Sequence, residues 1–230
     1  MTKIFCDIAD LNQIKKFNKK KIVKGFTTNP SLMRKAGAKN YINYCKSILK
    51  QTNKPISFEV FADDKKNIIK QALKIKSLGH QIYVKIPVTN SKGVFLGDVI
   101  KKLNKKKIKL NITAVYTSKQ TRKILNNLDK KTKAIISIFA GRMADAGKDP
   151  IPEIKNSIKI ANKFKNVEIL WASTREPYNY TQAMQIGCQI ITSPPSIIEK
   201  IERFGKSFNN LTIDTVKTFL VDSRKSKFKI

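Results

Sequence analysis

The chain has 230 residues, of which 41% are hydrophobic, so it is long and apolar enough for one large folded domain. No apolar run approaches the ~20 residues of a membrane-spanning helix, and no membrane partner is expected. The formal net charge is +31, but only six of the 47 basic residues are arginines and aromatic residues do not alternate with the basic runs. A lysine-rich solvated surface is therefore favoured over nucleic-acid binding, which would use arginines and stacking aromatics.

The N-terminal segment opens directly as Ile4-Phe5-Cys6-Asp7-Ile8, with no basic stretch before a long apolar one, so no signal peptide is expected. The three cysteines, Cys6, Cys45 and Cys188, are odd in number and far apart. They are typical of reduced thiols in a cytoplasmic protein. His80 is the only histidine, and no Cys or His pair has ligand spacing, so no metal site is expected.

Eight short apolar segments have the composition of buried β-strands, and amphipathic patterns such as 64–78 and 153–164 lie between them. Strands alternating with helices through short connections predict a parallel sheet, and eight of them predict a single-domain (β/α)8 TIM barrel over residues 1–230. Residues 206–221 predict an extra C-terminal helix, which packs on the barrel or on a neighbouring subunit. The predicted strands are 3–8, 22–28, 55–61, 81–86, 108–113, 134–139, 167–172 and 188–193.

Helix boundaries follow local signals. Starts are predicted at Asn29-Pro30-Ser31, Thr117-Ser118 and Pro194-Pro195-Ser196, and stops at Gly37, Gly79 and Gly187. The lysine runs all precede predicted strands, so we expect them at helix C-termini, on the barrel face opposite the active site. These runs are Lys15–Lys21, Lys50–Lys54, Lys101–Lys109, Lys130–Lys133 and Lys163–Lys165.

Lys85 differs from the other lysines because β-branched and aromatic residues surround it in Ile82-Tyr83-Val84-Lys85-Ile86-Pro87. Burial disfavours the charged form of an amine, and a neutral amine can attack a ketone to form a Schiff base. The alternative is a lysine at a strand end that extends to water.

Other strands also end in polar residues, where the active sites of such barrels lie. Singly, each could cap a turn, end a strand or, for Glu59, pair with Lys85. Together they place two acids, an amine, neutral hydrogen-bonding groups and two arginines on one rim. The predicted site residues, besides Lys85, are Asp7, Thr28, Asn29, Glu59, Asn111, Thr113, Ser137, Phe139, Arg142, Ser173 and Arg175.

These residue types suit cleavage of a C–C bond through an iminium. The amine forms the iminium, one carboxylate takes the proton of a hydroxyl two carbons away, and a second relays protons through a water. Arg142 and Arg175 can hold a phosphate, with Ser173 as a further donor. No cofactor is expected, because a pyridoxal-phosphate barrel would need a glycine-rich phosphate loop that is absent from the sequence.

Nearly the whole chain, from Phe5 to about Lys200, resembles the transaldolase family, in particular the short-chain branch that includes fructose-6-phosphate aldolase. The resemblance rests on the motif 25–32 (GFTTNPSL), followed in order by 84–87, 111–113, 137–142 and 172–175. It implies that Lys85 forms the Schiff base and Asp7 is the acid/base. It also implies that Glu59 and Thr113 position the relay water, and that the phosphate is held by Arg142, Ser173 and Arg175.

The same resemblance implies that Asn29, Asn111 and Ser137 contact the dihydroxyacetone unit. Glu59 and Phe139 are typical of transaldolases, whereas the aldolase branch has Gln and Tyr there. The expected activity is therefore transfer of dihydroxyacetone from sedoheptulose 7-phosphate to glyceraldehyde 3-phosphate in the pentose phosphate pathway. A fructose-6-phosphate aldolase-like lyase is the enzymatic alternative, and a basic nucleic-acid-binding protein without turnover is the alternative of another class.

The family resemblance further implies a homo-oligomer, such as a pentamer-based decamer, in which the C-terminal helix reaches a neighbour. Departures from the family pattern include Ile8 after the aspartate of strand 1 and Ile138 in place of a proline. Glu176 stands beside Arg175, and it predicts weakened or altered phosphate binding.

Overall fold

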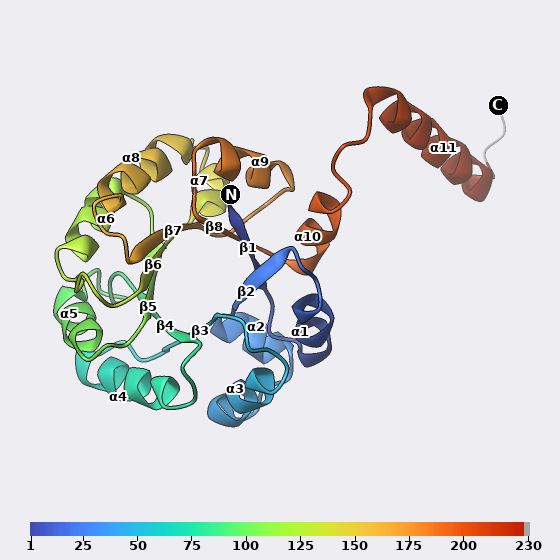
Figure 1. The fold of residues 1–230 in the computed structure, drawn as a ribbon. Coiled ribbons are helices and arrows are strands. Elements are labelled where there is room, and N and C mark those ends of the chain that lie inside the picture. Colours follow the sequence, from blue (N-terminus) through green and yellow to red (C-terminus); the bar gives the residue numbers. More distant parts are fainter. Residues whose placement is uncertain (228–230) are drawn as a thin grey trace.

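The computed structural model describes residues 1–227 and contains a closed barrel of eight parallel strands in sequential order, as predicted (Figure 1). Each strand pairs with the next along the chain, and the first also pairs with the last. The strands are β1 (Lys3–Asp7), β2 (Val23–Thr27), β3 (Ile56–Glu59), β4 (Ile82–Pro87), β5 (Leu110–Val115), β6 (Ala134–Ile138), β7 (Val167–Trp171) and β8 (Ile190–Ser193).

Helices form a ring around this barrel, and Figure 1 shows them covering its outer wall. The predicted starts are confirmed: Asn29 caps α2, and Thr117 forms a capping box with Gln120 at α6. The helices are α1 (Leu11–Asn18), α2 (Pro30–Lys35), α3 (Tyr41–Leu49), α4 (Lys65–Lys76), α5 (Gly97–Lys105), α6 (Ser118–Leu125), α7 (Ala140–Asp145), α8 (Ile151–Ala161), α9 (Tyr178–Gln185), α10 (Pro195–Ile201) and α11 (Phe208–Ser226).

Two apolar clusters stabilise the barrel. The larger one fills the layer between the strands and the helices, and the smaller one lies among inward-facing strand residues such as Phe5, Tyr83 and Leu170. Gly25 makes room for the second cluster, because a Cβ there would lie 2.6 Å from the Phe5 ring. The barrel interior toward the amino ends of the strands is therefore packed with side chains.

Side chains alternate along each strand, and the next inward-facing layer, toward the carboxyl ends of the strands, is polar. In β1 and β4 the inward residues two positions after Phe5 and Tyr83 are Asp7 and Lys85. In β8 the same step leads from Ile190 to Thr192. The carboxyl ends of all parallel strands meet at one end of the barrel, so these polar residues converge there.

The observed strands overlap all the predicted ranges, and strand 5 is shifted the most. We predicted strand 5 over 108–113, whereas β5 spans Leu110–Val115 and contains a register shift between Ile112 and Val115. Ala114 has a φ of 58°, a left-handed conformation typical of a bulge residue. A bulge depends on how neighbouring strands pair, and sequence composition does not reveal it.

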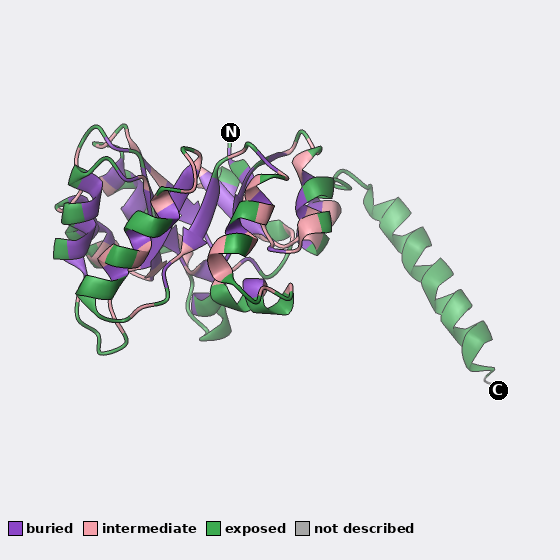
Figure 2. Cartoon of the chain, turned by 90° about the horizontal axis from the view of Figure 1, so that it is seen from below, coloured by how far each residue is buried: buried purple, intermediate pink, exposed green. Residues whose placement is uncertain are grey.

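The predicted lysine runs lie in the C-terminal halves of helices and in the loops before the next strand, as expected from the topology. The C-terminal helix differs from one expectation. It does not pack on its own barrel: residues 202–227 are all exposed, and α11 extends away from the body of the molecule (Figures 1 and 2). Within the described residues, every helix is too short or too polar to cross a membrane.

Candidate active site

A cavity of about 330 Å³ opens at the carboxyl ends of the strands, where the sequence predicted the site. Most predicted site residues line it, whereas Glu59, Thr28 and Asn111 lie behind the lining and contact residues that do. The lining consists of Asp7, Thr27, Asn29, Leu32, Lys85, Thr113, Ser137, Phe139, Arg142, Ala172, Ser173, Thr174, Arg175, Thr192 and Pro194.

Lys85 is only 7% exposed, and its amine lies within the polar layer. Nζ lies 3.0 Å from Glu59 Oε2 and donates to the backbone oxygen of Thr28 at 3.2 Å. Glu59 and Lys85 are register partners on β3 and β4, so their side chains leave adjacent strands at the same height. The Thr28 hydroxyl donates to Ser57 O at 2.8 Å, so Thr28 presents its carbonyl to the amine and not its side chain to the cavity.

Asp7 lies near this amine at the end of β1. Its Oδ1 accepts a hydrogen bond of 2.7 Å from the Thr27 hydroxyl, which in turn lies 2.5 Å from the Thr192 hydroxyl. Part of its surface faces the cavity, but protein atoms surround the carboxyl, and this burial raises its pKa above the ordinary aspartate range. The positive charge of Lys85 and the Thr27 hydrogen bond act in the opposite direction and reduce the rise.

One amide and two hydroxyl groups connect β3, β5 and β6 below the cavity. Asn111 donates to Ser57 Oγ at 3.0 Å and accepts from the Ser137 hydroxyl at 2.6 Å. These bonds hold Ser137 at the edge of the cavity with its side chain fixed. The buried Thr113 hydroxyl makes no hydrogen bond among the described residues, so it can bond to a substrate or a water.

The two arginines at the rim are held in different ways. The Arg142 guanidinium lies over the Phe139 ring, 5.5 Å from its centroid, and this cation–π contact restrains its direction. Arg175 forms a two-point ion pair with Asp145, with Nη2 2.5 Å from Oδ2 and Nε 2.9 Å from Oδ1. Glu176, which we expected to disturb Arg175, forms no ion pair among the described residues.

A close backbone contact brings these two arginines to the same rim. A Cβ on Gly141 would lie 1.6 Å from the Ser173 carbonyl oxygen, so only glycine lets the start of α7 approach the loop after β7. Ser173 has a φ of 65°, which turns the loop toward α7. Arg142 and Arg175 therefore lie on adjacent segments.

The sequence analysis missed three residues that contribute here. Thr27 and Thr192 line the cavity beside Asp7, and strand alternation after Gly25 and Ile190 could have indicated both. Asp145 pairs with Arg175 across 30 residues of sequence, and no local pattern signals that pairing.

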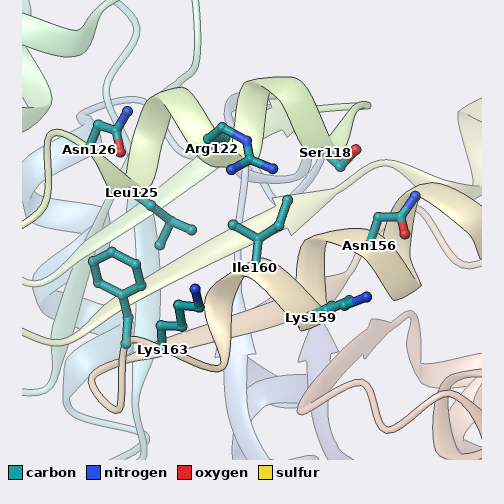
Figure 3. Close-up of a pocket in the computed structure, with 9 residues that line it drawn as sticks. Ser118, Arg122, Leu125, Asn126, Asn156, Lys159, Ile160 and Lys163 are labelled. Carbon is teal, nitrogen blue, oxygen red and sulfur yellow. The ribbon is translucent and has the colours of Figure 1, made fainter.

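A second cavity of about 520 Å³ lies outside the barrel, between α6 and α8 (Figure 3). Its lining includes Arg122, Lys159 and Lys163 but no carboxylate, so it lacks the acid/base groups found at the strand ends. Unpaired cations are common in a chain with 47 basic and 16 acidic residues, and these three do not by themselves indicate a site.

Proteins similar to this chain over most of its length are described as transaldolases. A "Probable transaldolase" of Thermoanaerobacter sp. (strain X514) is 31% identical over 229 residues, 99% of this chain and 100% of that protein. Another, from Sulfurihydrogenibium sp. (strain YO3AOP1), is 36% identical over 205 residues, 87% of this chain and 89% of that one.

Among solved structures, a putative phosphonomutase from Burkholderia cenocepacia J2315 has a TM-score of 0.59 at 9% identity, covering 96% of this chain and 94% of that one. That likeness shows the barrel fold alone. The profile of the Transaldolase/Fructose-6-phosphate aldolase family matches residues 4–230. The chain belongs to the transaldolase/fructose-6-phosphate aldolase family.

Proposed function

We propose that this protein is a transaldolase that transfers a dihydroxyacetone unit from sedoheptulose 7-phosphate to glyceraldehyde 3-phosphate, through a Schiff base on Lys85. The products are erythrose 4-phosphate and fructose 6-phosphate. The observation that carries the proposal is one buried amine flanked by two carboxylates, Glu59 and Asp7, with two arginines at the rim of the same cavity.

The first step is attack of the Lys85 amine on the ketone carbon. Glu59, 3.0 Å from Nζ, is placed to take the proton that the ammonium must lose. The carbinolamine then loses water and becomes an iminium. The free Thr113 hydroxyl can orient the water that carries protons during this step.

The second step breaks the bond between C3 and C4 of the ketose. Asp7 accepts the proton of the C4 hydroxyl, the C4 aldehyde leaves, and the bond electrons move into the iminium to form an enamine. The raised pKa of Asp7 makes it a stronger base than an ordinary carboxylate. In the reverse sense, the enamine attacks the acceptor aldehyde and Asp7 returns the proton, after which water hydrolyses the new iminium.

Transfer, as opposed to release of free dihydroxyacetone, requires that the enamine is not protonated before the acceptor arrives. The ring of Phe139 lines the cavity and brings no hydroxyl to it, while Tyr116 packs on the Phe139 edge at 6.0 Å between centroids. This arrangement supports a transferase over an aldolase-like lyase that releases dihydroxyacetone.

We further propose that sugar phosphates bind with their phosphate at Arg142 and Arg175, and that the protein is a ring-like homo-oligomer. Supporting the second point, α11 carries exposed apolar side chains along its length, including Phe208 at 89%, Val216 at 57% and Phe219 at 67% exposure. Exposed apolar side chains gathered on one helix are typical of a surface that another protein chain covers. Light scattering tests this: the full chain should be an oligomer, and Phe219→Asp should shift it toward smaller species.

Borohydride trapping tests the proposed chemistry. Incubation with fructose 6-phosphate, reduction and peptide mapping should give a dihydroxyacetone-sized adduct on Lys85. Lys54 and Lys109 serve as internal controls, because burial lowers the pKa of each and both lie outside the cavity. An unmodified Lys85 in folded protein would exclude the mechanism, and steeply salt-dependent nucleic-acid binding would then be the alternative to measure.

A further inference from the structure

Asp145 determines the direction of the Arg175 guanidinium. It lies at the end of α7, the helix that carries Arg142, whereas Arg175 lies in the loop before α9. Its two carboxylate oxygens receive the Nε and Nη2 hydrogens, at 2.9 Å from Nε to Oδ1 and 2.5 Å from Nη2 to Oδ2. Nη1 donates to the Ser173 backbone oxygen at 3.1 Å. The guanidinium is thus held on two sides.

These contacts leave part of the guanidinium available. A guanidinium has five N–H groups. Asp145 and the Ser173 carbonyl engage three of them, one on each nitrogen, so Nη1 and Nη2 each keep one free hydrogen. Arg175 lines the cavity, and its side chain is 45% exposed, so the free hydrogens can reach a phosphate without the Asp145 pair breaking.

We infer that Asp145 is a positioning residue that fixes Arg175 for phosphate binding and thereby sets the preference for phosphorylated substrates, an inference that rests on the proposed function. A mobile arginine loses side-chain entropy when it binds an anion, whereas a fixed one has already lost it. The same contact joins Arg175 to α7, the helix that carries Arg142.

The alternative is that Asp145 acts only through its negative charge, and it predicts the opposite effect on phosphate binding. A carboxylate near an anion site repels the anion, so if charge alone mattered, removing Asp145 would strengthen phosphate binding. Glu176 provides the matched control, because it follows Arg175 in sequence and forms no ion pair among residues 1–227. Glu176→Gln changes the charge without changing the Arg175 contacts.

The experiment compares Asp145→Asn, Asp145→Glu and Glu176→Gln in the full chain, with circular dichroism to establish folding. Calorimetry measures affinity for inorganic phosphate, and kinetics measure KM and kcat with fructose 6-phosphate and with unphosphorylated fructose as donors. We expect Asp145→Asn to weaken phosphate binding and raise KM for fructose 6-phosphate about threefold, with kcat and the fructose reaction unchanged. Asp145→Glu should restore part of the affinity, and Glu176→Gln should weaken nothing.

Unchanged or tighter phosphate binding in Asp145→Asn overturns the inference, and so does an absence of phosphate binding in the unaltered protein. A weakened phosphate affinity supports it even if fructose 6-phosphate forms no Schiff base, in which case the proposed function fails alone. If the unaltered protein transfers dihydroxyacetone and Asp145→Asn binds phosphate as tightly as it does, the inference fails and the proposed function stands.

Discussion

Lys85 Nζ lies 3.0 Å from Glu59 Oε2 because the two residues are register partners on adjacent parallel strands. The side chains are 9% and 16% exposed, so the pair is largely removed from water. A partly buried charge without its partner is costly, whereas removing both charges can be nearly neutral. Removing one partner of the pair should therefore cost more stability than removing both.

Lys85→Met should abolish Schiff-base formation and destabilise the fold by about 1–3 kcal/mol, because Glu59 is left without its counter-charge. The double variant Lys85→Met/Glu59→Gln should recover most of this loss. Urea denaturation of the two variants and the unaltered protein measures the difference. If the double variant is no more stable than Lys85→Met, Glu59 has another partner and the pair does not carry this energy.

Asp7→Asn should lower kcat by about 10²–10⁴-fold, the usual contribution of a general acid or base. Since burial raises the pKa of Asp7, the unaltered protein should gain activity as the pH rises through a value above the ordinary carboxyl range. A pH–rate profile checks this. An acid limb at the ordinary aspartate pKa would contradict the assignment of Asp7 as the base.

The same raised pKa predicts how stability depends on pH. The folded chain binds the Asp7 proton more tightly than the unfolded chain, so its contribution to stability is complete below the unfolded pKa and is lost as the pH rises through the folded one. Asp7→Asn lacks this loss, so its stability relative to the unaltered protein should improve between pH 4 and pH 7. Thermal unfolding at both pH values tests the sign, and a constant difference would contradict it.

Phe139→Tyr should raise the ratio of free dihydroxyacetone to transferred dihydroxyacetone, because a phenol at this position can protonate the enamine. Tyr116→Phe is the matched control, since it removes a hydroxyl from the ring that packs on Phe139 and keeps the ring. Coupled assays for free dihydroxyacetone and for erythrose 4-phosphate give the ratio. An unchanged ratio in Phe139→Tyr would leave the choice between transfer and release to other residues.

Gly141→Ala should raise KM for phosphorylated donors and destabilise the fold by about 1–3 kcal/mol, because the new methyl group overlaps the Ser173 carbonyl, 1.6 Å from its oxygen. The start of α7 must then move away from the loop that carries Arg175. Ala144→Ser, at an exposed position of the same helix, is the control and should change neither quantity. Comparing KM for fructose 6-phosphate and for fructose separates a rim effect from general unfolding.

The order of strands and helices could be predicted from the sequence because each element carries its own local signal. Apolar runs mark the strands, Asn29 and Thr117 mark helix starts, and parallel pairing brings all strand ends to one face. Lys85 could be singled out for the same reason, because its immediate neighbours are strand-forming residues.

The sequence alone determined the barrel and the residue types at its rim, because periodicity and strand direction are local properties of the chain. The tertiary structure decided which of these residues touch. Thr27 meets both Asp7 and Thr192, and Asp145 meets Arg175, only because distant segments come together around the closed barrel. The bulge at Ala114 and the free position of α11 likewise depend on pairing and packing between segments, which no single segment encodes.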